Sequence, residues 1–106
     1  MKPDTSTAAS IVALEERAAE AAQLLKLLAN EKRLMILCRL VAHREMSVGK
    51  LSTAVQLSQS ALSQHLALMR EDGLVATRRQ AQTVFYRVAD LNARRLLKLL
   101  KNIYCP

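Results

Sequence analysis

Aromatic side chains are nearly absent from this sequence: Phe, Tyr and Trp make up 3% of its 106 residues, and there is no Trp. Glycine and proline occur twice each, and the prolines, Pro3 and Pro106, stand at the two ends where neither interrupts an element. The core must therefore be built from Leu, Ala, Val, Ile and Met. With so few helix breakers, this composition favours a mostly helical protein.

Other absences narrow the function. Two glycines in all exclude, in practice, the glycine-rich loops that bind nucleotides. We find neither a nucleophile–base–acid set nor paired carboxylates in a cleft-like context, so we expect no enzyme and no cofactor. No stretch approaches the roughly 20 apolar residues of a membrane span, and the opening MKPDTSTAAS holds no signal-peptide core. We therefore expect a cytoplasmic chain with no membrane partner.

Cysteine is also scarce, with Cys38 and Cys105 as the two examples. In a reducing cytosol such a pair is not a structural disulfide by default. The alternatives are packing residues, metal ligands or thiols that react on purpose. Charged residues, in contrast, are plentiful and mostly basic: there are 16 Lys and Arg and 9 Asp and Glu, which gives a net charge of +7. This excess suggests an anionic partner, nucleic acid or membrane, unless it only aids solubility.

The apolar spacing predicts one domain over residues 8–106 after a flexible tail at 1–7. We expect helices at about 8–29, 31–43 and 48–55 and from Ser58 to Glu71, then a last helix after Asp90 or Asn92. Side chains suited to N-caps precede three of them, Asn30, Ser47 and Ser58, and Gly73 fits the end of the fourth. The last helix carries more apolar residues than one stripe needs, which suggests a partner chain.

After Gly73 the periodicity changes. The runs LVATRRQ and TVFYRV are rich in β-branched and aromatic residues and predict a hairpin with its turn at Gln80-Ala81-Gln82. That turn lacks the Gly or Asn that such turns usually contain. The predicted fold class is thus mainly α with a small β-hairpin, four helices followed by two strands and a final helix. This is the order of a winged helix-turn-helix.

The fourth helix, in LSQSALSQHLALMREDGLV (residues 57–75), has an unusual outer face. At 100° per residue an apolar arc gathers Ala61, Leu62, Leu66, Leu68 and Met69, with His65 in its middle as a partly buried histidine. The opposite arc holds short amides and hydroxyls and a single charge: Gln59, Ser60, Ser63, Gln64 and Arg70, with Ala67. In the major groove of DNA, amides pair with adenine, serine serves either base type, and Arg70 can reach a phosphate. The alternative is a merely polar surface helix.

Basic and amide residues surround the tip of the predicted hairpin. They are Arg78, Arg79, Gln80, Gln82 and Arg87. In a wing, such groups follow the phosphate backbone or enter a minor groove, although some arginines there are only solvated. We therefore expect double-stranded operator DNA as a partner.

Three segments resemble the ArsR/SmtB family of bacterial winged-helix repressors: LLKLLANEKRLMILCRL, LSQSALSQHLALMREDGLV and QTVFYRV. The resemblance implies a homodimer built through its first and last helices, and an inducer that weakens operator binding. The metal sites of the family are not matched. In EMSVGKL this chain has Ser47 and Gly49 in place of the thiols, and it has Asn92 where the last-helix site needs a histidine. No metal site is therefore expected.

The segments ILCRL and LLKNIYCP resemble the persulfide-responsive subgroup that includes BigR, SqrR and HlyU types. This resemblance implies that persulfide or polysulfide bridges Cys38 and Cys105 within one subunit and so releases operator DNA. The residues alone add that Lys98 and Lys101 can favour a Cys105 thiolate, and that Cys38 sits among apolar neighbours. They leave open a peroxide-type oxidant, haem or a metal as inducer, and a virulence or biofilm role as in HlyU-type regulators.

Overall fold

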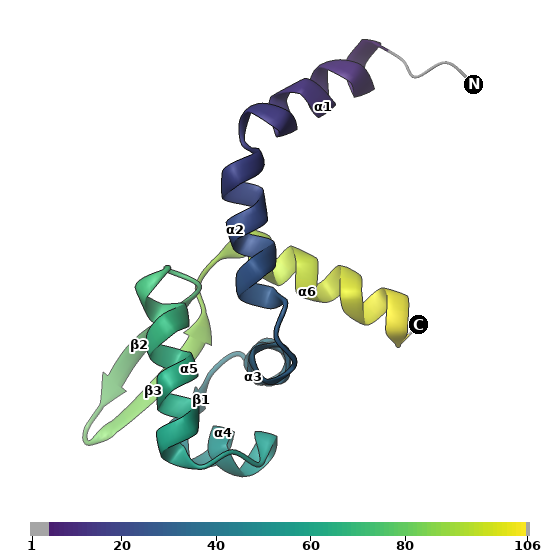
Figure 1. Ribbon diagram of the computed structural model, residues 1–106. Coiled ribbons are helices and arrows are strands. Elements are labelled where there is room, and N and C mark those ends of the chain that lie inside the picture. Colours follow the sequence, from purple (N-terminus) through teal and green to yellow (C-terminus); the bar gives the residue numbers. More distant parts are fainter. Residues whose placement is uncertain (1–4, 106) are drawn as a thin grey trace.

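The computed structural model describes residues 5–105, which form six helices and three short strands (Figure 1). In chain order these are α1 (Thr5–Glu16), α2 (Ala18–Leu28), α3 (Glu31–His43), β1 (Met46–Ser47), α4 (Val48–Val55), α5 (Gln59–Glu71), β2 (Val75–Gln80), β3 (Thr83–Val88) and α6 (Leu91–Tyr104). The mainly helical class with a hairpin before the last helix is confirmed.

The N-terminal region differs from the prediction of one helix after a tail at 1–7. Two helices form, and the first already begins at Thr5 because Ala8 and Ala9 propagate a helix readily. The break falls at Arg17, whose backbone has φ −112° and ψ 20° and whose N–H bonds to the Leu14 carbonyl at 3.0 Å, a three-residue turn. No proline or glycine marks it, and the apolar spacing continues across it. Residues 1–4 of the predicted tail lie outside the described part of the chain.

The predicted N-caps are confirmed. Asn30 accepts the N–H of Arg33 at 3.1 Å, and Ser58 accepts that of Ala61 at 3.2 Å. Of the two candidates before the last helix, Asp90 is the cap, because its carboxylate accepts the N–H groups of Asn92 at 2.8 Å and Ala93 at 2.9 Å. Ser47 caps α4 in the same way, through the N–H of Lys50 at 3.3 Å. These bonds satisfy amides that a helix start leaves unpaired.

The three strands form one antiparallel sheet in the order β1-β3-β2. Met46 lies opposite Tyr86, and the hairpin pairs residues from Val75–Val88 to Gln80–Thr83. The predicted three-residue turn is wrong: Gln80 is paired, so the turn consists of Ala81 and Gln82, and Ala81 takes a positive φ of 56°. The two-residue β1 was not predicted because so short a segment shows no alternation.

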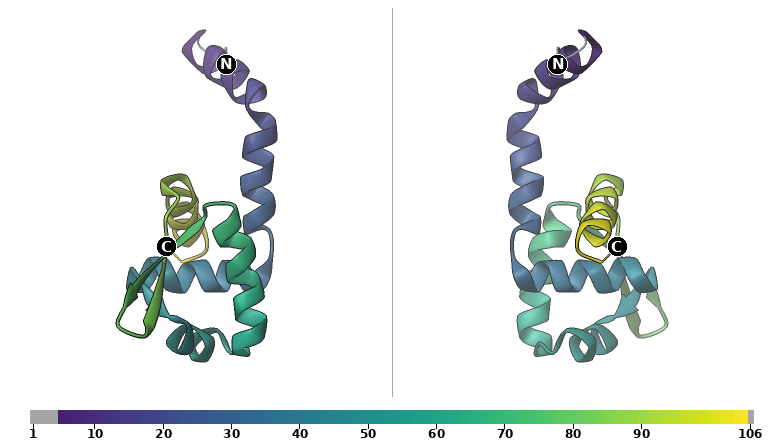
Figure 2. Two further views of the ribbon diagram at one scale, coloured as in Figure 1. Left: turned by 90° about the vertical axis from the view of Figure 1, so that its left-hand side faces the viewer. Right: turned by 90° about the vertical axis from the view of Figure 1, so that its right-hand side faces the viewer.

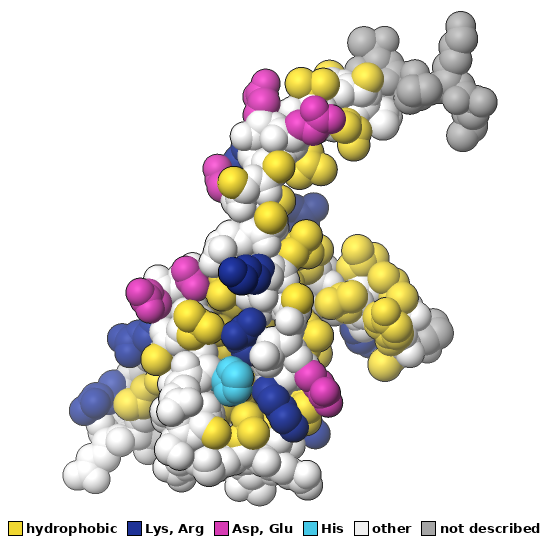
Figure 3. Space-filling model, viewed as in Figure 1, with side chains coloured by type: hydrophobic (Ala, Val, Ile, Leu, Met, Phe, Trp, Pro, Cys, Tyr) yellow, Lys and Arg dark blue, Asp and Glu magenta, His cyan; other side chains and the backbone are white. Residues whose placement is uncertain are grey.

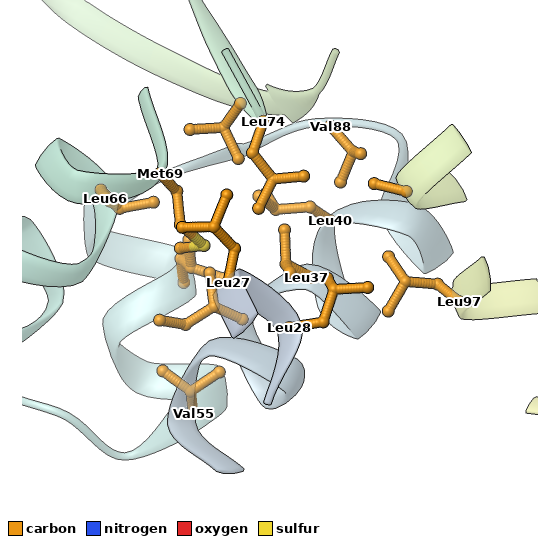
Figure 4. Close-up of a cluster of buried hydrophobic side chains, with 14 of the residues drawn as sticks. Leu27, Leu28, Leu37, Leu40, Val55, Leu66, Met69, Leu74, Val88 and Leu97 are labelled. Carbon is orange, nitrogen blue, oxygen red and sulfur yellow. The ribbon is translucent and has the colours of Figure 1, made fainter. Parts of the chain in front are cut away.

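One apolar core joins all elements except α1, and β1 contributes only the partly buried Met46 (Figure 4). It is lined by α2 at Leu27 and Leu28, while α3 crosses its centre. The fully buried side chains are aliphatic, as the shortage of aromatics requires: Ile36, Leu37, Leu40, Leu51, Val55, Leu62, Leu66, Met69 and Leu74. Arg33 fixes the α2–α3 corner, since its Nε donates to the Leu27 carbonyl at 2.7 Å.

The molecule is extended, measuring 56 × 30 × 22 Å with a radius of gyration of 16.3 Å. A compact chain of this length would have a radius of gyration of about 13 Å. The difference arises because α1 and the start of α2 project from the body, as Figures 1 and 2 show. Among residues 5–105 no helix is both long and apolar enough to cross a membrane.

Candidate DNA-binding surface and dithiol site

α5 presents the outer face that the sequence predicted. Its inner side is anchored by Leu62, Leu66 and Met69, all buried. The five residues predicted to contact DNA are all exposed: Gln59, Ser60, Ser63, Gln64 and Arg70. The predicted apolar arc is wrong at Leu68, which lies at the edge of that arc and is 41% exposed. His65 is half-buried, as predicted.

The turn before α5 holds the helix-turn-helix geometry. Gln56 ends α4 in the left-handed conformation, at φ 57° and ψ 43°. Ser52 then binds both main-chain groups of Leu57: its hydroxyl donates to the Leu57 carbonyl, and its carbonyl accepts the Leu57 N–H at 3.2 Å. α5 is therefore fixed relative to α4 before any ligand arrives.

Gly73 closes the other end of α5, as predicted. Its φ of 75° is one that side chains disfavour, and its N–H bonds to the Arg70 carbonyl at 3.0 Å. The next N–H, that of Leu74, bonds to the Met69 carbonyl at 2.9 Å. Because Leu74 and Val75 are buried directly after this turn, α5 and the hairpin are held as one unit.

The hairpin exposes the four predicted wing residues, Arg78, Arg79, Gln80 and Gln82. Arg78 is engaged within the protein: its Nε donates to the Glu45 carboxylate at 2.9 Å, and its guanidinium lies 4.7 Å from the centre of the Phe85 ring. The hydrogen bond from Arg78 lowers the pKa of Glu45. No sequence signal points to Glu45, which lies 33 residues away. Arg79 points to the opposite side of the strand from Arg78 and has no ion pair within the described region.

The two cysteines lie on separate helices. Cys38 is on α3 and Cys105 follows α6; both are free and exposed. A hollow of about 230 Å³ lies between the helices, lined by Cys38, Val41, Ala42, Leu97, Lys98 and Lys101. Partial burial, and then the negative charge of a nearby Cys105 thiolate, raise the pKa of Cys38. Because α3 and α6 are in contact, the fold brings the two cysteines to one region of the molecule, although the chain separates them by 67 positions.

Metal ligands do not gather around this pair. Within residues 5–105 no group of three or more His, Cys, Asp or Glu side chains is placed to hold a metal ion. Zinc sites need three or four such ligands at close range. The chemistry available at the site is that of the Cys38 thiol beside Lys98 and Lys101, with Cys105 one turn beyond Lys101.

Sequence and structure comparisons identify relatives. Residues 30–77 match the description "Bacterial regulatory protein, arsR family". The chain is 53% identical to the transcriptional activator HlyU of Vibrio cholerae over 92 residues, which cover 87% of this chain and 84% of the relative. It is 48% identical to the biofilm growth-associated repressor of Agrobacterium fabrum over 93 residues, covering 88% and 79%.

Solved structures agree. Reduced HlyU from Vibrio cholerae gives a TM-score of 0.81 at 53% identity, covering 88% of this chain and 97% of that one. The repressor BigR from Xylella fastidiosa gives 0.81 at 43% identity, covering 88% and 94%. The winged helix-turn-helix class is thereby confirmed. These relatives are transcription regulators and not enzymes. This chain therefore belongs to the ArsR family of DNA-binding bacterial regulatory proteins.

Proposed function

We propose that this regulator is a homodimeric repressor that releases operator DNA when persulfide or polysulfide oxidises Cys38 and Cys105. The observation that carries the switch is the place of Cys38, in a hollow that α3 shares with α6, whose C-terminal end carries Cys105. Its site of action is the cytoplasm, where reducing conditions keep both thiols reduced at rest. The names of two relatives support the proposal: one solved protein is described as reduced HlyU, another as the repressor BigR.

In the DNA-bound state α5 lies in the major groove. Gln59, Ser60, Ser63 and Gln64 meet base edges, because amides and hydroxyls are the groups that read them. Their shortness lets the helix backbone approach closely. Arg70 and the wing residues Arg79 and Gln82 meet phosphates or a minor groove. Arg78 contributes less to DNA binding, since Glu45 already neutralises it.

Exposed apolar side chains supply the dimer interface. On α1 they are Ile11, Val12 and Leu14, each 50% exposed or more, and on α6 Leu99 and Ile103 are 54% and 57% exposed. Figure 3 shows hydrophobic side chains gathered along both regions. A surface of this kind on a chain of 106 residues favours a partner. A two-fold dimer places the α5 helices in half-sites about 34–36 Å apart, or a multiple of that.

The interface can be tested by sedimentation velocity. Ile103→Glu places a charge in the apolar surface and should convert the dimer to monomer. Asn102→Glu adds the same charge one position away on α6, on a different face, and should leave the dimer intact. An unchanged sedimentation coefficient for both variants would show that α6 is not in the interface.

The redox step balances without an external oxidant other than the persulfide itself. The outer sulfur of R–S–SH is the oxidant: two cysteine thiolates and one R–S–SH give one cysteine–cysteine bond, RS⁻ and HS⁻. If both cysteines first accept a sulfur, the attack of one persulfide on the other leaves a three-sulfur bridge and HS⁻. A longer bridge relaxes the condition that a plain disulfide sets, Cα atoms within about 7 Å.

A bridge ties α3, which crosses the core, to α6, which carries the dimer face. The tie rotates one α5 against the other, so both half-sites lose contacts together. The coupling required is modest, about 1–3 kcal/mol as in typical allostery.

The test combines intact mass with DNA binding. The reduced protein is treated with a persulfide donor or, separately, with peroxide, and its operator affinity is followed by fluorescence anisotropy. We expect persulfide to bridge Cys38 and Cys105 and to weaken binding to operator DNA. Cys38→Ser and Cys105→Ser should each abolish that response and leave the operator affinity of the reduced protein unchanged. Release by peroxide alone would indicate a general oxidant sensor, and release by persulfide in Cys38→Ser would overturn the bridge.

A further inference from the structure

A second hollow, of about 460 Å³, adjoins the one at Cys38. It is lined by Val41, Arg44, Arg94 and Lys98. Val41 and Lys98 also line the hollow of Cys38, so the two hollows are neighbours along the groove between α3 and α6. The volume falls within the roughly 300–1,000 Å³ of small-molecule sites.

The walls of these two hollows are strongly positive. Arg94, Lys98 and Lys101 follow one another at intervals of four and three and so share one face of α6. Arg44 approaches from the end of α3. None of the four side chains forms an ion pair with any residue that the structure describes, and no acidic residue lines either hollow. Unpaired cations in a concave site attract anions.

Arg44 carries a second sign of function. It is held at φ 66° and ψ −50°, a conformation that a non-glycine residue rarely adopts. The N–H of the next residue, Glu45, bonds back to the His43 carbonyl at 2.7 Å, which fixes this bend. Strained backbone of this kind clusters at ligand sites, because the surrounding structure keeps a side chain where it is needed.

The basic groove is distinct from the apolar side of α6. At 3.6 residues per turn, Leu99 and Ile103 lie on the far side of α6 from Arg94 and Lys98, so a dimer formed through them leaves the groove open. Figures 1 and 2 place α3 between α6 and α4, so the groove and α4 lie on opposite sides of α3. At its other end, Arg44 is followed by Glu45, which binds Arg78 of the wing. A dimer formed through Leu99 and Ile103 therefore leaves four unpaired cations in the groove, of which Lys98 and Lys101 line the hollow of Cys38.

We propose that this groove binds the carboxylates of an organic persulfide, the persulfide of an amino-acid or peptide thiol, and thereby selects the sulfur donor. The inference rests on the proposed function, since it names the donor for the same dithiol. Arg44 and Arg94 are suited to bidentate carboxylate bonds at the distal end. The sulfane sulfur then faces Cys38. Attack by a cysteine thiolate on R–S–SH gives Cys–S–SH and RS⁻, and Lys98 and Lys101 stabilise the departing thiolate.

The test compares two donors across matched variants. Glutathione persulfide carries two carboxylates, whereas the persulfide of mercaptoethanol carries none. We expect Arg44→Gln and Arg94→Gln to slow dithiol oxidation by glutathione persulfide about tenfold, the value of a charge-assisted hydrogen bond, and to leave the uncharged donor within about twofold. Arg95→Gln removes the same charge from an exposed neighbouring position on α6 and should affect neither donor.

Equal slowing with both donors, equal slowing by Arg95→Gln, or no preference between donors in the unaltered protein would each overturn the proposal. A second measurement separates this site from the redox function. S-methylglutathione keeps both carboxylates but transfers no sulfur, and calorimetry should show it binding the reduced protein and losing affinity in Arg44→Gln and Arg94→Gln. If S-methylglutathione binds with this dependence on Arg44 and Arg94 while no persulfide oxidises the thiols, the proposed function fails and the anion site stands. If it does not bind, the anion site fails whatever the thiols do.

Discussion

α5 and α6 are helices of almost equal length, 13 and 14 residues, but they are anchored very differently. α5 buries Leu62, Leu66 and Met69 and is fixed at both ends by the Ser58 cap and the Gly73 turn. α6 buries only Ala93 and Leu97 within the chain. Its outer faces differ as well, because one side is apolar and another carries Arg94, Lys98 and Lys101. α5 is therefore held by more buried side chains than α6 within this chain.

This difference in anchoring suits the two helices to different roles. A base-reading face needs defined positions, since hydrogen bonds to base edges tolerate little displacement. A helix held by few contacts can shift when a bond forms at its end, and that is what a switch requires. The predictions below test the two halves of this comparison.

The largest effect is expected on the buried side of α5. Leu66→Ala removes a fully buried side chain and should lower the free energy of unfolding by about 2–5 kcal/mol. Leu68→Ala, two positions away and 41% exposed, should change it by no more than about 0.5 kcal/mol. Urea denaturation followed by circular dichroism measures both. Equal losses would mean that α5 is not anchored on one side only.

The next effect concerns the outer face of α5. Gln64→Ala should weaken binding to operator DNA by about 1–3 kcal/mol and binding to random DNA much less, because an amide that reads a base contributes only where that base is present. Asn102→Ala removes an exposed amide from α6 and should alter neither affinity. Fluorescence anisotropy on both DNAs provides the measurement, and equal losses on the two would make Gln64 a phosphate contact.

A smaller effect is expected at the wing tip, which is joined to α5 through Gly73. Ala81→Gly should raise stability by up to about 1 kcal/mol, because relief of roughly 1–2 kcal/mol of left-handed strain outweighs the added flexibility of glycine. Ala76→Gly, in the paired part of β2, should instead lower stability by about 0.5–1 kcal/mol. A lower melting temperature for Ala81→Gly would show that the tip is not strained.

The smallest effect is a change in the pKa of Cys38 when Cys105, which follows α6, is replaced. Cys105→Ser removes a neighbouring negative charge and should lower the pKa of Cys38, though not to its ordinary value, because burial is the larger cause of the rise. The rate of Cys38 alkylation by iodoacetamide should therefore reach its midpoint at a lower pH than in the unaltered protein. Asn102→Ala should leave that midpoint in place. An unchanged midpoint in Cys105→Ser would mean that the thiols do not interact.

The sign of the Cys38 shift also sets a pH window for stability. A thiol whose pKa is raised by folding supports the folded state fully below its ordinary pKa. That contribution is lost as the pH rises through the raised value. We expect alkaline pH to loosen the α3–α6 groove, and Cys38→Ser to reduce this dependence.

Local chemistry explains which features the sequence could predict. Asn30, Ser47, Ser58 and Gly73 act within a few residues of their own position, and each was predicted correctly. The polar face of α5 was readable because one helical period separates it from the buried side. Features that depend on distant partners could not be read: the Arg78–Glu45 ion pair spans 33 positions, and the hollow beside Cys38 needs both α3 and α6. The break at Arg17 left no trace because the apolar spacing continues through it.

The separation of the two sides of α5 has an evolutionary consequence. Exchanges among small uncharged residues at Gln59, Ser60, Ser63 and Gln64 touch no core contact and leave the net charge of +7 unchanged. With α5 reading bases as proposed, such exchanges redirect the protein to a new operator and leave its charge and its folding unaltered. Under that proposal, duplicated copies of this gene acquire separate target genes through this face alone.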